Sequence, residues 1–268
     1  MTQPAIFSES DGYERFMGRW SRLLAPPFLA FAQVGEGCVV LDVGCGTGAL
    51  AYAAADIGSV NATGVDSCEA YVRCAQEHAA AHPVRFEVGD AQALPYPDAT
   101  FDRALSMLVL NFLDEPVTAL REMIRVTRTD GVVAAAVWDY GDGMGMLRTF
   151  WDEAVALIPD AEARDERRMP LSTQGELAGL WRAQGLGDVQ ERPLTIESVF
   201  RSFDDYWQPF QAGQGPAGSF TVSLPESTRR VLQSRLRDRF LDDGPDRRFT
   251  LPARAWAVRG VVKRQRTR

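Results

Sequence analysis

Short apolar runs alternate with longer amphipathic segments along the first half of the chain. Apart from the run at 84–88 (VRFEV), these runs lack the strict polar and apolar alternation of a strand with one face in water. They cover residues 38–43, 60–65, 84–88, 101–107 and 132–138. Such runs are typical of strands buried on both faces, and the segments between them are long enough for helices. The pattern therefore predicts βαβ units and a mainly parallel sheet.

The alternation changes after residue 138. Residues 139–187 are too long for one crossover helix, and they contain an amphipathic segment from Met146 to Val155 and a capping box of Thr173 and Glu176. A strand at 188–199, a helix at 226–240 and a last strand at 253–263 are expected to follow. We interpret the chain as one domain with a helical insertion.

Local signals predict several element boundaries. The segment before the first strand is expected to form short helical pieces that break at Pro26-Pro27. Ser67 is a candidate N-cap for the helix after the second strand. The helix that begins near Asp114 and Pro116 is expected to end near Gly131.

Composition narrows the class of protein. The chain has 268 residues, 46% of them hydrophobic, and a formal net charge of −7. An acidic surface repels phosphate backbones, which argues against a nucleic-acid partner. The first residues do not resemble a secretory signal, no long apolar run predicts a membrane span, and the four cysteines show no C-x-x-C pairing. We interpret this as a reduced, cytoplasmic protein.

A glycine-rich loop carries the strongest chemical signal. Gly44, Gly46 and Gly48 follow the first strand and precede an alanine-rich helix, so main-chain N–H groups can approach an anionic ligand. Asp66 ends the second strand, where a carboxylate can accept both hydroxyls of a ribose. The arrangement predicts a nucleoside ligand, but the glycines alone fit both a dinucleotide and other adenosine derivatives.

Two further carboxylates favour an adenosine derivative that carries an amino group. Asp42 precedes the first glycine, where a carboxylate suits a cation better than a pyrophosphate. Asp90, in the loop after the third strand, is placed to accept a hydrogen bond from an adenine amino group. No second nucleotide-binding half is evident in the sequence.

The segments "VLDVGCGTG", "GVDSCEAYVRCA", "GDAQALPYPDATFD" and "ALSMLVLNFLDEPVTALREMIRVTRTDGVV" together resemble the class I S-adenosylmethionine-dependent methyltransferases, in the broad group that includes the ubiquinone/menaquinone-biosynthesis type. The resemblance implies an α/β fold: a Rossmann-like three-layer sandwich with a mostly parallel seven-stranded sheet, an antiparallel last strand and a helical insertion after strand 5. It divides the single domain into a helical segment (1–37), a cofactor-binding core (38–138), a helical cap (139–187) and a C-terminal part that completes the sheet (188–268).

The resemblance also implies a set of residues that bind S-adenosyl-L-methionine. Asp42 would bind the amino group, Asp66 the ribose, Asp90 the adenine edge, and Ser106 would lie beside the sulfonium. The full set is Tyr13, Arg19, Asp42, Gly44, Cys45, Gly46, Gly48, Asp66, Ser67, Asp90, Ala91, Ser106 and Met107. At Asn111 many relatives have histidine, so a histidine role at that position does not carry over.

Catalytic residues are less evident, because methyl transfer from a sulfonium needs alignment more than acid–base chemistry. Asp139 and Tyr140, after the fifth strand, are candidates for a base or an orienting group. His78 and His82 stand four residues apart on a predicted helix, but a structural or solvated pair fits them better than a metal site, so we expect no metal.

The sequence favours methyl transfer to a small apolar or aromatic acceptor. Aromatic residues gather in strand 5, the insertion and the segment after strand 6, where they either line a pocket or form a core. A nicotinamide-dependent oxidoreductase and a non-catalytic relative that binds the cofactor remain as alternatives. The oligomeric state stays open, with a homodimer among the alternatives.

Overall fold

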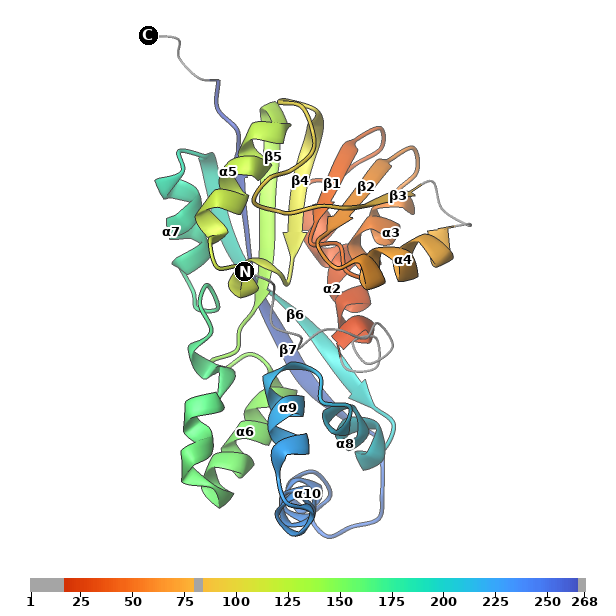
Figure 1. Cartoon of the computed structure of the whole chain (residues 1–268), viewed down its shortest axis with the longest axis vertical. Coiled ribbons are helices and arrows are strands. Elements are labelled where there is room, and N and C mark those ends of the chain that lie inside the picture. The colour runs from red at the N-terminus through yellow and green to blue at the C-terminus, as the bar shows by residue number, and fades with distance from the viewer. Residues whose placement is uncertain (1–16, 80–83, 265–268) are drawn as a thin grey trace. The chain divides into compact units, whose positions relative to one another are not determined.

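The computed structural model of the chain describes residues 17–79 and 84–264. Its centre is a seven-stranded sheet with the strand order β3-β2-β1-β4-β5-β7-β6 (Figure 1). Strands β1 to β5 pair in parallel, and β7 pairs with β5 antiparallel. The predicted Rossmann-like α/β fold with an antiparallel last strand is confirmed.

The elements alternate as the hydrophobic pattern predicts. In chain order they are α2 (Arg19–Phe31), β1 (Val39–Val43), α3 (Ala49–Ala55), β2 (Asn61–Asp66), α4 (Glu69–His78), β3 (Val84–Val88), β4 (Phe101–Met107), η4 (Leu110–Phe112), α5 (Pro116–Val126), β5 (Thr127–Trp138), α6 (Gly145–Leu157), η5 (Pro159–Arg164), η6 (Glu166–Arg168), α7 (Glu176–Ala183), β6 (Gly187–Phe200), α8 (Phe203–Gln211), α9 (Gly215–Ser223), α10 (Glu226–Leu241) and β7 (Phe249–Val261).

The described residues group into two compact units. Of the described residues, the sheet unit comprises 20–79, 84–138, 170–194 and 255–264, and the helical unit comprises 17–19, 139–169 and 195–254. Residues 139–187 therefore do not all belong to the same unit. The interpretation of the whole chain as one domain stays a prediction.

Apolar strands and amphipathic helices build the sheet unit. Helix α3 packs on β1 and β2, α4 on β2 and β3, and α5 on β4 and β5. The run from Val132 to Trp138 is buried throughout, which explains why strand β5 shows no alternation of polar and apolar residues. Trp181 of α7 lies in the same core and donates its indole N–H to the carbonyl of Val133 at 2.9 Å.

The predicted helix break at Pro26-Pro27 is wrong. Helix α2 continues through both prolines. Pro26 and Pro27 have no N–H to donate to the carbonyls of Arg22 and Leu23, and both of those residues lie on the exposed face, where water can reach their carbonyls. The opposite face, which includes Phe28, is buried. Burial of this stripe outweighs the poor helix propensity of proline.

Other boundaries also differ from the prediction. Helix α5 ends at Val126 and not near Gly131, because the chain enters β5 directly and the Thr127 hydroxyl donates to the Met123 carbonyl at 2.7 Å. Helices α8 and α9 were not predicted. Each is nine residues long, and α8 contains Pro209. Pro209 in α8, and the two glycines and the proline of α9 (GPAGSFTVS), weaken the helical signal of these segments.

Buried aromatic rings form the core of the helical unit. Phe150 stacks on Phe210 with 4.5 Å between ring centroids, and Trp151 packs against Phe220 at 5.3 Å. The OH of Tyr206 donates to the Met146 carbonyl at 3.0 Å. These aromatic side chains therefore pack against one another, as core residues do.

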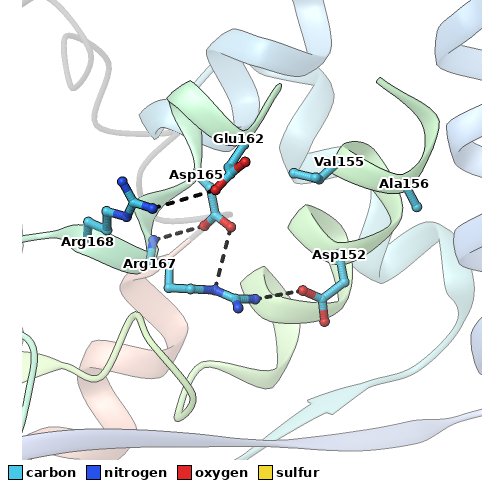
Figure 2. A pocket seen from close by; sticks show the side chains of 7 residues that line it. All are labelled: Asp152, Val155, Ala156, Glu162, Asp165, Arg167 and Arg168. Atoms are coloured by element: carbon cyan, nitrogen blue, oxygen red, sulfur yellow. Dashed lines mark hydrogen bonds and ion pairs between the residues drawn. The ribbon is translucent and has the colours of Figure 1, made fainter. Parts of the chain in front are cut away.

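The helical unit has a surface hollow of about 370 Å³, drawn in Figure 2. It is lined by Asp152, Val155, Ala156, Glu162, Asp165, Arg167 and Arg168. Arg167 pairs with Asp152 at 2.8 Å and with Asp165 at 3.8 Å, and Arg168 lies 3.6 Å from Glu162. The carboxylates of Asp152, Asp165 and Glu162 in the lining are therefore already paired with arginine side chains of the same lining.

Glu166, next to Asp165, is buried and accepts a hydrogen bond from the indole N–H of Trp151 at 2.9 Å. Burial raises its pKa to about 7, against the opposing effects of the Trp151 hydrogen bond and the Arg148 charge. Its ionisation therefore opposes folding: stability falls as the pH rises from the unfolded pKa near 4.5 to about 7.

Replacing Glu166 by glutamine is expected to remove this pH dependence, because the amide stays neutral and its oxygen can still accept from Trp151. The variant should match the wild type near pH 5 and exceed it by about 2–3 kcal/mol near pH 8. Urea unfolding at both pH values measures the difference. Glu162→Gln, at the exposed rim, serves as the control, and an equal gain at both pH values would contradict the assignment.

Among the described residues, no helix is both long and apolar enough to cross a membrane.

Candidate functional site

The glycine loop connects β1 to α3 and turns back against β2. The N–H groups of Gly44 and Cys45 both donate to the Val65 carbonyl, at 2.8 and 3.0 Å. Gly44 has a φ of 76°, and a Cβ there would lie 2.5 Å from the Val109 side chain. A Cβ on Gly46 would meet no described heavy atom within 4 Å. The loop is thus tightly packed at Gly44 and open at Gly46, where a ligand can approach the main chain.

Asp42 lies beneath this loop and is only 2% exposed. Its Oδ2 has no hydrogen-bond partner among the described residues. Burial raises its pKa to about 8, the charge of Asp66 adds to the rise, and a main-chain hydrogen bond from Ala51 opposes it. A buried carboxylate with an unpaired oxygen is costly unless a cation or a hydrogen-bond donor meets it.

Asp66 organises the neighbouring turn. Its Oδ2 accepts from the Gly46 N–H at 2.9 Å, and its Oδ1 accepts from the Cys68 N–H at 2.8 Å. Burial raises its pKa, while these main-chain hydrogen bonds oppose the rise. Ser67 is exposed and is not the N-cap of α4: the cap position is Cys68, without a side-chain cap. The predicted Ser67 cap is wrong: α4 begins one residue later than expected, after a turn that the Asp66 carboxylate holds through the Cys68 N–H.

Asp90 lies close to Asp66 along the sheet edge, because Asp66 pairs with Val88 and its carbonyl accepts from the Gly89 N–H at 3.0 Å. The Asp90 carboxylate is exposed and accepts from the Gln92 N–H at 2.8 Å. Asp90 therefore begins a tight turn at the point where β3 ends, with Ala91 inside the turn.

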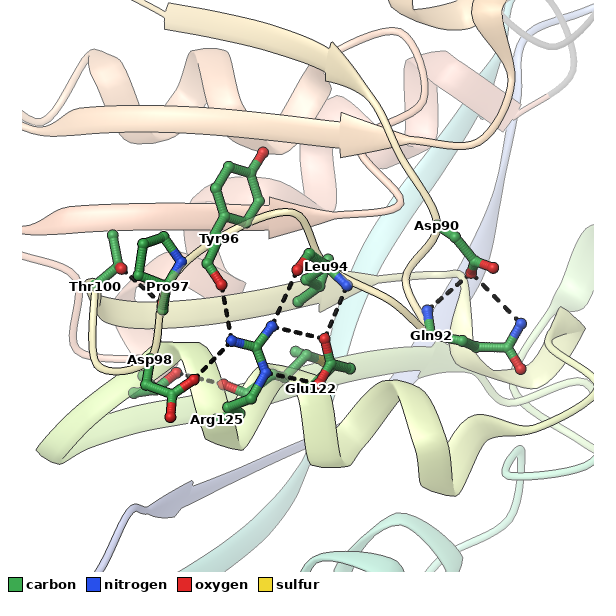
Figure 3. Close-up of polar contacts among 11 residues, drawn as sticks. Asp90, Gln92, Leu94, Tyr96, Pro97, Asp98, Thr100, Glu122 and Arg125 are labelled. Atoms are coloured by element: carbon green, nitrogen blue, oxygen red, sulfur yellow. Dashed lines mark hydrogen bonds and ion pairs between the residues drawn. The ribbon is translucent and has the colours of Figure 1, made fainter.

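An ion pair on α5 holds the rest of this loop, as Figure 3 shows. Arg125 donates to the Tyr96 carbonyl at 2.7 Å, to the Leu94 carbonyl at 3.0 Å and to the Asp98 carboxylate at 2.8 Å. Glu122 pairs with Arg125 at 2.7 Å and accepts from the Leu94 N–H at 2.9 Å. The sequence analysis did not single out either residue, because a Glu and an Arg three apart on a helix also fit an ordinary surface pair.

Replacing Arg125 by methionine is expected to loosen the segment from Asp90 to Asp98. Several charge-assisted hydrogen bonds are lost, so stability should fall by about 2 kcal/mol, and affinity for S-adenosylhomocysteine by roughly 10-fold. Urea unfolding and titration calorimetry measure the two effects. Arg121→Met, one turn earlier on the exposed face of α5, is the control. Equal losses of stability and affinity in both variants would argue against a special role of Arg125 in holding the loop.

The end of β4 adds neutral polar groups to the same unit. Ser106 is fully buried, and Met107 is 8% exposed. The Ser106 hydroxyl, both amide atoms of Asn111 and the indole N–H of Trp138 have no hydrogen-bond partner within the described part of the chain. Asp42 pairs in register with Leu105 of β4, so Ser106 lies on the strand next to Asp42 and Asn111 follows that strand. Trp138 ends the next strand, β5. Sequence reasoning gave Asn111 no role.

Several predicted site residues are not among the described residues of the sheet unit. Tyr13 falls outside the described residues. Arg19 belongs to the helical unit, where it pairs with Asp205 at 3.0 Å. Asp139 and Tyr140 belong to the same unit, and the Asp139 carboxylate pairs with Arg254 at 2.6 Å. The roles predicted for Arg19, Asp139 and Tyr140 stay predictions.

The described residues contain no cluster of three or more side chains that could hold a metal ion. His78 lies on exposed α4 surface, with its Nδ1 at 2.8 Å from the Cys74 carbonyl oxygen. His82 falls outside the described residues.

The sheet unit therefore brings together the carboxyl ends of β1, β2, β3 and β4. Asp42, the glycine loop, Asp66, Ser67, Asp90, Ala91, Ser106 and Met107 all lie there. In open α/β sheets, ligands bind outside the carboxyl ends of the strands. The edge offers an open approach to the main chain at Gly46, two carboxylates below the surface and several unpaired neutral groups. The N–H groups of Gly44, Cys45 and Gly46 already donate within the chain.

Comparisons with known proteins find similar sequences and a similar fold. Residues 41–135 match the family described as a methyltransferase domain. The chain is 26% identical over 228 residues to an uncharacterized protein of Mycobacterium tuberculosis, covering 82% of each chain. It is 32% identical over 179 residues to the malonyl-[acyl-carrier protein] O-methyltransferase of Pseudescherichia vulneris, covering 66% of this chain and 64% of that one. The crystal structure of the Bacillus subtilis YcgJ protein has a similar fold, with a TM-score of 0.59 and 20% identity over 90% of this chain and 99% of that one.

Proposed function

We propose a reaction for this chain from the premise that it is a class I S-adenosylmethionine-dependent methyltransferase. The chain is an enzyme that uses S-adenosyl-L-methionine. The proposed reaction is methyl transfer to a small, uncharged organic acceptor with apolar or aromatic character. We propose which residues hold the cofactor and which class of acceptor receives the methyl group.

The buried Asp42 carboxylate is the main observation that supports cofactor binding at this edge of the sheet. Its unpaired Oδ2 lies beneath a loop that is open at Gly46, and burial keeps it from ionising without a positive partner. The cofactor has an amino group that supplies such a partner, and its ribose suits Asp66. The residues of this edge therefore fit the cofactor.

The chain's own task in this reaction is alignment. When bound, S-adenosylmethionine supplies an activated methyl group on a sulfonium. Asp42, Asp66 and the glycine loop would fix the position of that methyl group, and the loop at Asp90 would fix the adenine. Such alignment contributes on the order of 7–11 kcal/mol to catalysis, so a dedicated base is not required for every acceptor.

Two features support a small uncharged acceptor. The formal net charge of −7 disfavours nucleic acid. The polar groups that follow β4 and end β5 are neutral: a hydroxyl, a primary amide and an indole N–H from Ser106, Asn111 and Trp138. These three groups carry no charge, so they favour a neutral molecule over an ion, whose lost hydration they would not offset.

Titration calorimetry with S-adenosylhomocysteine and with NAD tests the site. We expect S-adenosylhomocysteine to bind and NAD to bind weakly or not at all; the reverse result would support the oxidoreductase. Transfer of labelled methyl groups to a panel of phenols, amines and carboxylic acids then tests catalysis. Cofactor binding without transfer to any of them would support the non-catalytic alternative.

A further inference from the structure

Asn111 is a buried side chain whose amide has nothing to bind within the described chain. It lies in η4 (Leu110–Phe112), directly after β4, and is 4% exposed. Neither its Oδ1 nor its Nδ2 has a hydrogen-bond partner among the described residues. Buried polar groups are nearly always paired, so an amide unpaired at both ends indicates a missing partner molecule.

The surrounding chain places Asn111 beside the glycine loop. The Val109 side chain packs against the main chain of Gly44, leaving no room for a Cβ there. Leu108, one residue earlier, has a φ of 68°, and its N–H donates to the Ala136 carbonyl at 2.7 Å. A non-glycine residue in this left-handed conformation is strained, and such strain is concentrated at functional sites. The turn thus fixes residues 108–111 at the carboxyl end of β4.

We propose that Asn111 binds the methyl acceptor and selects a neutral hydroxyl or carboxamide group on it. This inference rests on the function proposed above. The amide oxygen accepts from the acceptor's O–H or N–H, and the amide NH₂ donates to its oxygen. Asn111 therefore acts as a substrate-binding residue that orients the acceptor, not as a base.

The chemistry of an amide explains this selection. A hydroxyl or a carboxamide both donates and accepts hydrogen bonds, so it can satisfy Oδ1 and Nδ2 together. A carboxylate only accepts, and an ammonium only donates, so each would leave one end of the Asn111 amide unpaired. Either ion would also lose its hydration at a buried site without an opposite charge on Asn111. Sites built for such paired hydrogen bonds reject analogues that lack one partner.

The test uses the protein saturated with S-adenosylhomocysteine and four probes that share a six-membered ring: phenol, benzamide, benzoate and benzylamine. Ligand-observed NMR titrations give their dissociation constants. We expect phenol or benzamide to bind at least roughly 10-fold more tightly than benzoate and benzylamine. Asn111→Leu, of similar volume, should remove this preference, while affinity for S-adenosylhomocysteine stays within about twofold of wild type. Asn61→Leu, at an exposed asparagine of β2, should change neither quantity.

The outcomes separate this inference from the proposed function. If the wild type does not bind S-adenosylhomocysteine, the proposed function fails, and this inference fails with it. If the cofactor product binds but Asn111→Leu keeps the preference, or benzoate or benzylamine binds best, or neither neutral probe binds, only the role of Asn111 is overturned. A roughly 10-fold loss of S-adenosylhomocysteine affinity in Asn111→Leu would assign the amide to the cofactor and also overturn the proposal. Asn111→Ala repeats the comparison if the leucine variant does not fold.

Discussion

Asp42→Asn is expected to stabilise the ligand-free protein and to weaken S-adenosylhomocysteine binding by roughly 100-fold or more, about 2.7 kcal/mol. The two effects have one cause. The carboxylate is buried with one oxygen unpaired, so it is unfavourable in the empty site and favourable once an ammonium group faces it. Asparagine keeps the shape and one acceptor oxygen but loses the charge.

The stabilising effect of Asp42→Asn should grow with pH. The folded-state pKa of Asp42 is raised to about 8 from a usual value of 3.8, so the folded wild type holds a proton that the unfolded chain has lost. The wild type therefore loses stability as pH rises between these values, whereas the variant has no such proton. The gap between the two should widen by about 4 kcal/mol from pH 5 to pH 8. Urea unfolding at both pH values measures it.

The number of protons released when the ligand binds is a second, independent measure of the ionisation of Asp42. At pH 6.5, below the ordinary pKa of an α-amino group, the ligand amine is already protonated. An ammonium beside Asp42 should lower the pKa of that carboxyl, so binding should release about one proton in the wild type and none in Asp42→Asn. Calorimetry in buffers of different ionisation enthalpy counts the proton. Asp114→Asn, at an exposed carboxylate, is the control; unchanged affinity in Asp42→Asn would refute its role.

Asp66→Ala is expected to have the second largest effect, with loss of both stability and cofactor affinity. The carboxylate accepts from the N–H groups of Gly46 and Cys68, at 2.9 and 2.8 Å, so its removal leaves two donors unpaired. Stability should fall by about 2–4 kcal/mol, since hydrogen bonds to charged groups are stronger than neutral ones. Affinity for S-adenosylhomocysteine should fall by roughly 100-fold, because the ribose loses its acceptor and the loop loses its anchor.

A second variant separates the structural role of Asp66 from its binding role. Asp66→Asn keeps one oxygen for a main-chain N–H but turns an NH₂ donor toward the other. Urea unfolding gives the stability of each variant, and calorimetry well below its unfolding temperature gives the affinity. A fall in stability with unchanged affinity would show that Asp66 supports the loop without contacting the ligand.

Pattern and spacing predicted most of the sheet. The bounds of β3 and β4 agree with the runs at 84–88 and 101–107. Strand β4 is marked by its largely buried, apolar composition, whereas β3 lies at the edge of the sheet and buries only Phe86. The pattern failed where packing opposes propensity, as in helix α2, which continues through Pro26 and Pro27 because its other face is buried. It also failed at α8 and α9, where Pro209 in α8 and the glycines and proline of α9 oppose helix formation and packing decides the conformation.

The sequence by itself determined the parallel sheet, the glycine loop and the order of the carboxylates along it, because chain direction and strand periodicity place Asp42, Asp66 and Asp90 at successive strand ends. Only the tertiary structure decided which polar groups have partners. In that structure Arg125 donates to the carbonyls of Leu94 and Tyr96, and Asp66 accepts from two main-chain N–H groups. The Asn111 amide has no hydrogen-bond partner within the described chain. Hydrogen-bond satisfaction depends on groups far apart in sequence, and no local pattern encodes it.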